Sequence, residues 1–384
     1  MRKNQRLYDI LAEKGFDGAI FCLPENVVHA SGMTTFPNLY SANFFTWSLP
    51  LATVLMNVQD GSEILYVAES MAAEAERMSF FDEIRTFVPY RMDKNVDPVQ
   101  EYARGLKEAV FECMPKTGIL GVEAAGFPWG ASAALKRLVL PSLEMKDVTG
   151  AVYESKMVKA PWELKRMRKA AAVIDAGMEC FIRTAKKAGA GEIDLWKEIL
   201  GAMYHKAGGH IPTSGELVTG ERTFDAPYPG GPVPRRTKKG DVGLMDMSAR
   251  VDGYWCDCCN IVSYGEKNEM QLRYFEVIKN AYDYTTDALR PGATCSDVFR
   301  AAERAYTEQG FACPHYIGHS IGSGVNDMPK IIPCDHTVIE EGMCFSMEPG
   351  IYRQNMGLRI EKMLLVTKEG CEEFNRFEWG VGNE

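Results

Sequence analysis

The chain has 384 residues, of which 46% are hydrophobic and 25% are charged, a balance that is typical of folded globular proteins and argues against disorder. Its formal net charge of -9 at pH 7 disfavours non-specific binding to nucleic acids, because no long block of lysine and arginine is present. The densest basic cluster spans only residues 235–239, and the length leaves room for two domains.

Targeting and membrane segments are not evident in the sequence. Residues 1–6 lead into Leu7, Ile10 and Leu11 at helical spacing, without the long apolar core or the cleavage site of a signal peptide. No uninterrupted apolar run reaches the length that crosses a bilayer. The eleven cysteines are odd in number and scattered, which favours free thiols over a disulfide framework. We therefore expect a cytoplasmic protein that binds neither membranes nor nucleic acids.

The first part of the chain predicts a small α/β domain over residues 1–153. Residues 16–21 and 63–67 have the apolar pattern of strands, and residues 106–113 have that of a helix. Between the two strands, residues 36–47 form a predicted loop that is rich in aromatic side chains. Aromatic residues usually pack in a core, but this many beside Pro, Asn and Ser also fit a lid over a binding site.

A second domain, residues 154–384, is predicted to begin with a helix at Pro161, since proline favours the first position of a helix. Apolar residues recur in this helix at spacings of three and four, which predicts a stripe that faces the core. The stripe consists of Leu164, Met167, Ala171, Ile174, Met178 and Phe181. Two similar stripes predict helices that contain residues 195–203 and 272–289. Residues 291–294 (Pro-Gly-Ala-Thr) then close one helix before the next starts at Ser296.

Residues 240–265 predict a β-hairpin, because apolar and polar residues roughly alternate and Asp252-Gly253 is a dipeptide preferred at tight turns. With the turn centred there, Asp257 lies opposite Ser248, and Asp246 is its diagonal neighbour. Side chains alternate along a strand with period two, so these three share one face of the hairpin. The two carboxylates repel each other, which indicates that a positive group lies between them.

Three downstream residues have contexts that would bring further ligands to the same point. His319 is flanked by small residues, Glu348 opens a Glu-Pro-Gly turn at a strand end, and Glu361 follows the alternating run 358–360. Four carboxylates would balance two divalent cations, and the histidine adds one nitrogen ligand. Such a set suits Mn²⁺, Fe²⁺, Co²⁺ or Zn²⁺ rather than a structural thiolate zinc site. Each residue alone is more often a surface, turn or hydrogen-bonding residue, so the prediction depends on the whole set.

The set and its order resemble the pita-bread metallohydrolases, which include methionine aminopeptidase, aminopeptidase P, prolidase and the non-peptidase creatinase. In that family the ligands come in the order Asp, Asp, His, Glu, Glu. Residues 348–352 (Glu-Pro-Gly-Ile-Tyr) and 359–361 (Arg-Ile-Glu) carry the resemblance most specifically, and it covers nearly the whole chain. The resemblance implies an α+β protein, with a pita-bread (creatinase/aminopeptidase) catalytic domain and a smaller N-terminal α/β domain.

The N-terminal part is similar to the domain found in the creatinase and prolidase branch, which methionine aminopeptidase lacks. Residues 25–32 resemble an early signature of that branch. In the branch, the N-terminal domain of one subunit reaches the active site of the other. The resemblance therefore implies a homodimer, in which residues 36–47 help to wall the partner's site, and a small peptide or zwitterion as substrate.

The resemblance also implies two divalent metal ions, Mn²⁺ first with Co²⁺, Zn²⁺ or Fe²⁺ as alternatives, and attack on an amide bond by a hydroxide that bridges them. Asp257 and Glu361 would bridge the ions, Asp246 would chelate one ion and His319 would bind the other. Glu348 would be a ligand and also the proton shuttle for the attacking water.

Two neighbours of these ligands have roles that stay open. Arg359 would orient Glu361 or the carboxylate of the substrate, and a plain salt bridge between strands is an equal alternative. Cys259, two residues after Asp257, should face the metals at a position where the family commonly has a threonine. A packed, inert thiol is favoured there over a thiolate ligand.

The chain departs from the prolidase pattern at two positions. Prolidase-like peptidases have a substrate-binding histidine before the first metal-binding aspartate and a His-Glu pair after the metal-binding histidine. This chain has Tyr228 at the first position and Asn326-Asp327 at the second. Asparagine can donate a hydrogen bond but cannot deliver a proton. Protonation of the leaving nitrogen then passes to Glu348, Tyr228, Asp327 or a nearby histidine such as His210, unless the substrate is not a dipeptide.

Three functions are therefore compatible with the sequence. The first is an Xaa-Pro dipeptidase or aminopeptidase, which we predict to turn over standard dipeptides weakly because both auxiliary histidines are missing. The second is a non-peptidase relative that acts on a small zwitterion, as creatinase, ectoine hydrolase and dimethylsulfoniopropionate lyase do. The third is a catalytically silent binding protein, and the intact ligand set argues against it.

Overall fold

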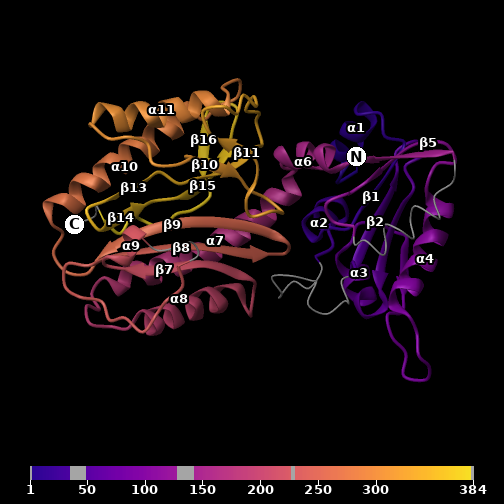
Figure 1. Ribbon diagram of the computed structural model, residues 1–384, viewed down its shortest axis with the longest axis horizontal. Coiled ribbons are helices and arrows are strands. Elements are labelled where there is room, and N and C mark those ends of the chain that lie inside the picture. Colours follow the sequence, from indigo (N-terminus) through magenta and orange to yellow (C-terminus); the bar gives the residue numbers. More distant parts are fainter. Residues whose placement is uncertain (1, 35–48, 128–141, 226–229, 382–384) are drawn as a thin grey trace. The chain divides into compact units, whose positions relative to one another are not determined.

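The computed structural model describes residues 2–34, 49–127, 142–225 and 230–381. The chain divides into two compact units, Met1–Lys156 and Met157–Glu384, which run from indigo to magenta and from magenta to yellow in Figure 1. None of the helices in the described ranges has the length and apolarity that crossing a bilayer requires.

The N-terminal unit is built on a six-stranded sheet with strand order β4-β3-β2-β1-β5-β6. Strands β1, β2 and β3 pair in antiparallel fashion, and β4, β5 and β6 add parallel strands at the two edges. The strands are β1 (Gly18–Phe21), β2 (Ala52–Asn57), β3 (Glu63–Ala68), β4 (Ile84–Phe87), β5 (Gly118–Val122) and β6 (Leu143–Asp147). The helices are α1 (Gln5–Glu13), α2 (Pro24–Ser31), the 3-10 helix η2 (Glu69–Met71), α3 (Ala72–Met78), α4 (Pro98–Cys113) and α6 (Thr149–Met157). The predicted α/β character of this unit is confirmed.

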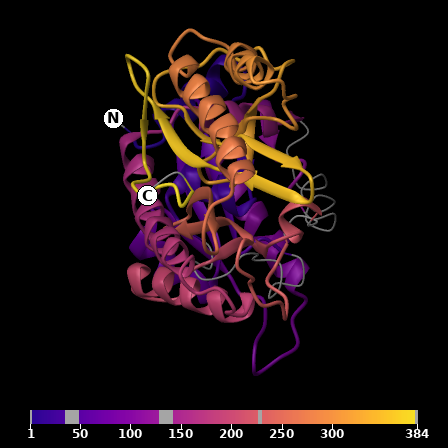
Figure 2. The same ribbon diagram turned by 90° about the vertical axis from the view of Figure 1, so that its left-hand side faces the viewer.

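The second unit has two helix pairs, α7 (Pro161–Thr184) with α8 (Glu192–Ala207), and α10 (Glu269–Ala288) with α11 (Cys295–Glu308). Figures 1 and 2 show the two pairs on opposite sides of the strands. Helix α7 begins at Pro161, as predicted. Helix α11 begins one residue before the predicted start, because Thr294 accepts a hydrogen bond from the backbone of Asp297 and caps the helix. A short helix, α9 (Arg222–Asp225), follows the first strand.

All strand pairs of the second unit are antiparallel within the described residues. A three-stranded sheet contains β7 (Thr213–Thr219), β8 (Val242–Val251) and β9 (Tyr254–Ser263), and β13 (Gly350–Arg353) pairs with β14 (Met356–Arg359). A five-stranded sheet has the order β11 (Asp327–Ile331), β10 (Gly318–Ser320), β12 (Cys344–Met347), β15 (Lys362–Val366) and β16 (Cys371–Glu373). Two backbone hydrogen bonds between Cys259 and Glu361, of 2.8 and 3.2 Å, join the three-stranded sheet to the chain just before β15.

The hairpin of β8 and β9 has the predicted register. Asp252 and Gly253 have φ angles of 50° and 87°, the left-handed values that a two-residue turn of this kind needs. Ser248 pairs with Asp257 and Asp246 pairs with Cys259, so Asp246 and Asp257 are diagonal neighbours. The Ser248 hydroxyl donates a hydrogen bond of 2.9 Å to Asp257, which shows that the two side chains share a face.

Leu272 in α10 differs from the predicted core stripe, because its side chain is 44% exposed. The start of the helix explains the difference. Asn268 and Gln271 cap each other across the first turn, and the Gln271 side chain is directed inward, where it bonds Ser263 and the carbonyl oxygen of Gly240. Leu272, one position further on, is therefore turned toward solvent.

Candidate metal centre

The five predicted ligands all line one cavity of about 330 Å³ in the second unit. They come from different elements. Asp246 and Asp257 lie on β8 and β9, and His319 lies on β10. Glu348 follows β12 directly, and Glu361 precedes β15. The folding of the unit thus brings together residues that are up to 115 positions apart in the sequence, from Asp246 to Glu361.

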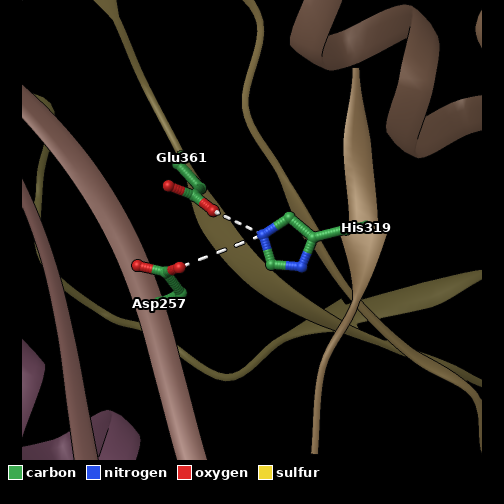
Figure 3. A group of neighbouring side chains, drawn as sticks. All are labelled: Asp257, His319 and Glu361. Atoms are coloured by element: carbon green, nitrogen blue, oxygen red, sulfur yellow. Dashed lines mark ion pairs between the residues drawn. The ribbon is translucent and has the colours of Figure 1, made fainter. Parts of the chain in front are cut away.

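Three of these residues, Asp257, His319 and Glu361, each place one ligand atom within 4.8 Å of the others. Figure 3 shows their side chains pointing toward one another from separate segments. The Nε2 atom of His319 lies 3.9 Å from Asp257 Oδ2, 3.9 Å from Glu361 Oε1 and 3.7 Å from Glu348 Oε1. Its Nδ1 atom lies 3.0 Å from the carbonyl oxygen of Ser320 and must donate there. In the neutral ring, Nε2 therefore presents its lone pair to the carboxylates.

The electrostatics of the cluster call for a cation. Burial, with Asp246 and Glu348 adding to it, raises the pKa of Asp257 well above its usual range, and burial with Asp257 does the same to the pKa of Glu361. Burial lowers the pKa of His319 to about 4, so the imidazole does not supply a positive charge at neutral pH. Among the described residues, Glu361 Oε1 is buried without a hydrogen-bond donor. The unpaired Glu361 oxygen, the lone pair of His319 Nε2 and the opposed carboxylates together fit a site for divalent metal ions.

Glu348 lies at the edge of this cluster and faces the cavity. Burial raises its pKa to about 7, although Arg359 acts in the opposite direction. The glycine that follows Pro349 is needed here, because a Cβ at Gly350 would meet His315 Nε2 and the Tyr352 hydroxyl, each at 2.9 Å. The turn after Glu348 is thus packed directly against two further side chains of the cavity.

Of the roles that the sequence left open for Arg359, the structure shows a salt bridge, and its partners are Asp246 and Glu216 and not Glu361. Its guanidinium approaches Asp246 Oδ2 at 2.6 and 3.1 Å, donates to the Tyr352 hydroxyl at 2.8 Å and also binds Glu216. Glu216 and Asp246 are paired across β7 and β8, so their carboxylates can share one guanidinium. Glu216 was not predicted, because its place beside Asp246 depends on the register of β7.

The predicted histidine His210 does not lie in this cavity. It is exposed after the end of α8, with its ring centroid 5.1 Å from that of Tyr204. The second imidazole of the cavity belongs to His315, whose Nδ1 lies 2.6 Å from the carbonyl oxygen of Tyr316. Its Nε2 atom is buried and has no hydrogen-bond partner within the described ranges. The only signal in the sequence was its position four residues before His319.

The remaining predicted catalytic residues differ in their position relative to the cavity. Asn326 lines the cavity, together with Tyr316 and Tyr352, which the sequence analysis did not single out as site residues. Asp327 is not among the described residues that line it, and accepts a hydrogen bond from the Gly324 backbone at 3.3 Å. Asn326 lies in the bend before β11, whereas Asp327 is the first residue of that strand and its carboxylate is held by the Gly324 backbone. Tyr228 and the aromatic run 36–47 lie outside the described residues.

Cys259 is a packed thiol, as favoured from the sequence. It is fully buried, and its Sγ atom donates to the carbonyl oxygen of Arg359 at 3.3 Å. Burial raises the pKa of this thiol well above its usual range, so it stays protonated. Cys256 and Cys258 lie on the other face of β9, with sulfur atoms 3.7 Å apart.

The fold and the acidic cavity around His319 define a metallohydrolase of the pita-bread type with a creatinase-type N-terminal domain. Comparison with known proteins agrees. Residues 165–368 match the model of metallopeptidase family M24, and residues 3–158 match that of the creatinase/prolidase N-terminal domain. The chain therefore belongs to metallopeptidase family M24 and is a metal-dependent peptidase.

One of the relatives described here matches part of the chain, and the other relative and the two solved structures match nearly all of it. An Xaa-Pro dipeptidase of Pyrococcus horikoshii is 25% identical over 96% of this chain and 99% of its own length. An Xaa-Pro dipeptidase of Lactobacillus helveticus is 30% identical over 59% of this chain and 62% of its own length. The crystal structure of a dipeptidase from P. horikoshii superposes with a TM-score of 0.80 at 22% identity, covering 99% of both chains. An Xaa-Pro dipeptidase from Bacillus anthracis superposes with a TM-score of 0.77 at 22% identity, covering 98% of both chains.

Proposed function

We propose that this protein hydrolyses Xaa-Pro dipeptides or closely related small peptides with two divalent metal ions. The observation that carries the proposal is the convergence of three carboxylates on the Nε2 atom of His319, at 3.7 to 3.9 Å, inside a cavity of about 330 Å³. A cavity of this size suits a small substrate. The relatives named above as Xaa-Pro dipeptidases support the choice of peptide.

The proposed ligands are Asp246, Asp257, His319, Glu348 and Glu361. Their four carboxylates balance two divalent cations, and an oxygen-rich set with one imidazole favours Mn²⁺, with Co²⁺, Zn²⁺ or Fe²⁺ as alternatives. Such ions, when bound, activate water near neutral pH and polarise the carbonyl group that the water attacks. We therefore assign catalysis to the domain that spans residues 154–384, which contains all five proposed ligands.

Side chains of the cavity, together with Lys330 of the adjoining strand β11, supply the remaining functions. Glu348 faces the cavity and is placed to take a proton from the attacking water and pass it to the leaving nitrogen. Arg359 holds Asp246 in place. Lys330 is opposite His319 in the register of β10 and β11. Burial lowers the pKa of its half-buried ammonium, and the negative charges of Glu348 and Asp327 act in the opposite direction. This ammonium is placed to attract the free carboxylate of a dipeptide.

The second candidate is a non-peptidase relative that acts on a small zwitterion. The presence of Asn326 in the cavity, where prolidase-like enzymes have an imidazole, favours it. We further propose a homodimer and a cytoplasmic location. The match to the creatinase/prolidase N-terminal domain supports the dimer, and the eleven free cysteines support a reducing compartment.

A screen of the metal-loaded protein separates these candidates. Purified protein is stripped, reconstituted with Mn²⁺ and offered Xaa-Pro dipeptides, longer peptides with proline in second position, and small betaines. We expect two metal equivalents per chain and release of proline from the dipeptides. Asp257→Asn should reduce the metal content, whereas Glu372→Gln, which alters an exposed carboxylate paired with Arg168, should not. Turnover of a betaine without any peptide cleavage would favour the second candidate, and a saturating metal content of zero would contradict both.

A further inference from the structure

We propose that Tyr316 is a catalytic residue, whose hydroxyl donates a hydrogen bond to the carbonyl oxygen of the scissile amide as that oxygen becomes negatively charged. The inference rests on the proposed peptidase function and extends it. Tyr316 would supply a donor that the asparagine at position 326 supplies only in part.

The position of Tyr316 in the cavity carries the proposal. It lies three residues before His319, and its ring centroid is 6.4 Å from that of the imidazole. It lines the same cavity as the five proposed ligands. Glu348 and Asn326 line the same cavity and are close enough to the Tyr316 hydroxyl to shift its pKa in opposite directions. The hydroxyl thus stands between the proposed proton shuttle and the residue that replaces the auxiliary histidine.

The chemistry of these two neighbours favours one orientation of the hydroxyl. Glu348 as a carboxylate can only accept a hydrogen bond, whereas the Asn326 amide can donate to the phenol oxygen, so we expect the Tyr316 proton on the Glu348 side. When Glu348 takes the proton of the attacking water, it becomes a poorer acceptor. The oxyanion formed at the same moment is then the stronger acceptor for the Tyr316 proton. The hydroxyl can therefore turn from Glu348 to the substrate as the reaction proceeds.

The proposed step conserves atoms, protons and electron pairs. The water oxygen bonds to the carbonyl carbon, one water proton goes to Glu348, and the π electron pair of the carbonyl moves to its oxygen. Tyr316 donates a hydrogen bond to that oxygen and keeps its proton. The C–N bond then breaks, the carbonyl re-forms, and the proton held by Glu348 passes to the leaving nitrogen.

The phenol is in its donating form at neutral pH, because the ordinary pKa of a tyrosine hydroxyl is about 10. The ammonium of Lys330 lies 5.8 Å from the centroid of the Tyr316 ring and adds a positive charge beside it. Both features favour negative charge on a substrate oxygen beside the hydroxyl.

Tyr316→Phe tests the proposal in the Mn²⁺-loaded protein. Loss of one well-placed donor to an oxyanion typically costs about 10²- to 10³-fold in kcat, and we expect KM to change little. Metal content should stay at that of the wild type. By calorimetry, affinity for a phosphinic dipeptide analogue with a tetrahedral centre should fall by a comparable factor, while affinity for free proline should not. Tyr284→Phe, which removes an exposed hydroxyl bound to Glu308, is the matched control.

A second variant tests the path through the hydroxyl. Adding Asn326→Ala to Tyr316→Phe should cost little beyond Tyr316→Phe alone, because Asn326 acts by orienting that hydroxyl. Wild-type kcat and phosphinate affinity in Tyr316→Phe would overturn the role of Tyr316 and leave the peptidase function standing. Loss of metal in Tyr316→Phe would show that Tyr316 supports the position of Glu348, and this result would also overturn the catalytic role of Tyr316. Wild-type protein that neither cleaves a peptide nor binds the phosphinate would instead overturn the peptidase function itself, and this proposal with it.

Discussion

The guanidinium of Arg359 lies directly against Asp246, a proposed metal ligand, and also binds Glu216. Its side chain is 13% exposed, and although burial acts to lower the pKa of the guanidinium, Asp246 and Glu216 help to hold that pKa well above its usual range, so the group is a fixed charge. One positive charge shared between two carboxylates leaves Asp246 with part of its negative charge for a metal ion. Arg359 thus both neutralises and orients the pair, a task that lysine, as a point charge, would perform less well.

Arg359→Ala should therefore destabilise the protein strongly. The change leaves Asp246 and Glu216 buried without their counter-charge, which typically costs about 3–5 kcal/mol. Urea titration followed by circular dichroism measures the free energy of unfolding. Arg304→Ala removes an exposed arginine that lies 3.8 Å from Glu308 and should cost less than about 1 kcal/mol. Equal losses in the two variants would contradict the role given to Arg359.

At the scale of elements, the turn of the β8–β9 hairpin sets the place of two proposed ligands. Because side chains alternate along a strand, a shift of one residue in the register would turn Asp246 or Asp257 away from the cavity. The left-handed conformation of Gly253 fixes this register, since a residue with a Cβ is strained there.

Gly253→Ala should lower stability by about 1–2 kcal/mol and reduce the metal content at limiting Mn²⁺. Gly201→Ala is the matched control, because Gly201 lies within α8 and an added Cβ meets nothing within 4 Å. That change should stabilise the protein by about 0.5–1 kcal/mol. Thermal unfolding and metal analysis of both variants provide the comparison. A Gly253→Ala protein as stable as the wild type would show that the turn does not set the register.

These elements also show how far the sequence could be used for prediction. The hairpin register and the start of α7 follow from local signals, namely the Asp-Gly turn and the proline at the first helical position. The contact of Glu216 with Arg359 depends on the pairing of β7 with β8, for which the sequence has no local signal. Tyr316 was missed for a related reason, because its direction is set by the chain entering β10 and not by a motif.

At the scale of the whole molecule, stability should depend on pH differently with and without metal. In the metal-free fold the pKa values of Asp257, Glu348 and Glu361 are raised, so the folded state binds more protons than the unfolded chain. Stability is then highest below the ordinary carboxyl range of about 4 and decreases as the pH rises through the raised values, about 7 for Glu348. With metal bound, protons compete with the ions and the sign reverses.

The melting temperature of chelator-treated protein should accordingly fall, relative to the Mn²⁺-loaded protein, as the pH is raised from about 5 to about 7.5. Differential scanning calorimetry of both forms at each pH gives the difference. Glu361→Gln, which removes one of the opposed charges, should flatten the pH dependence of the metal-free form. A difference that does not change with pH would contradict the electrostatic account of the centre.

The two backbone hydrogen bonds between Cys259 and Glu361 have a consequence for biosynthesis. Asp246 and Asp257 come from the segment that follows the first helix pair, and His319, Glu348 and Glu361 come from the segment that follows the second. A nascent chain that has emerged only as far as β9 holds two of the five proposed ligands, and the strand segment that pairs with Cys259 is still to be made. A metal site that uses all five proposed ligands can therefore be completed only after both halves of the catalytic unit have been synthesised.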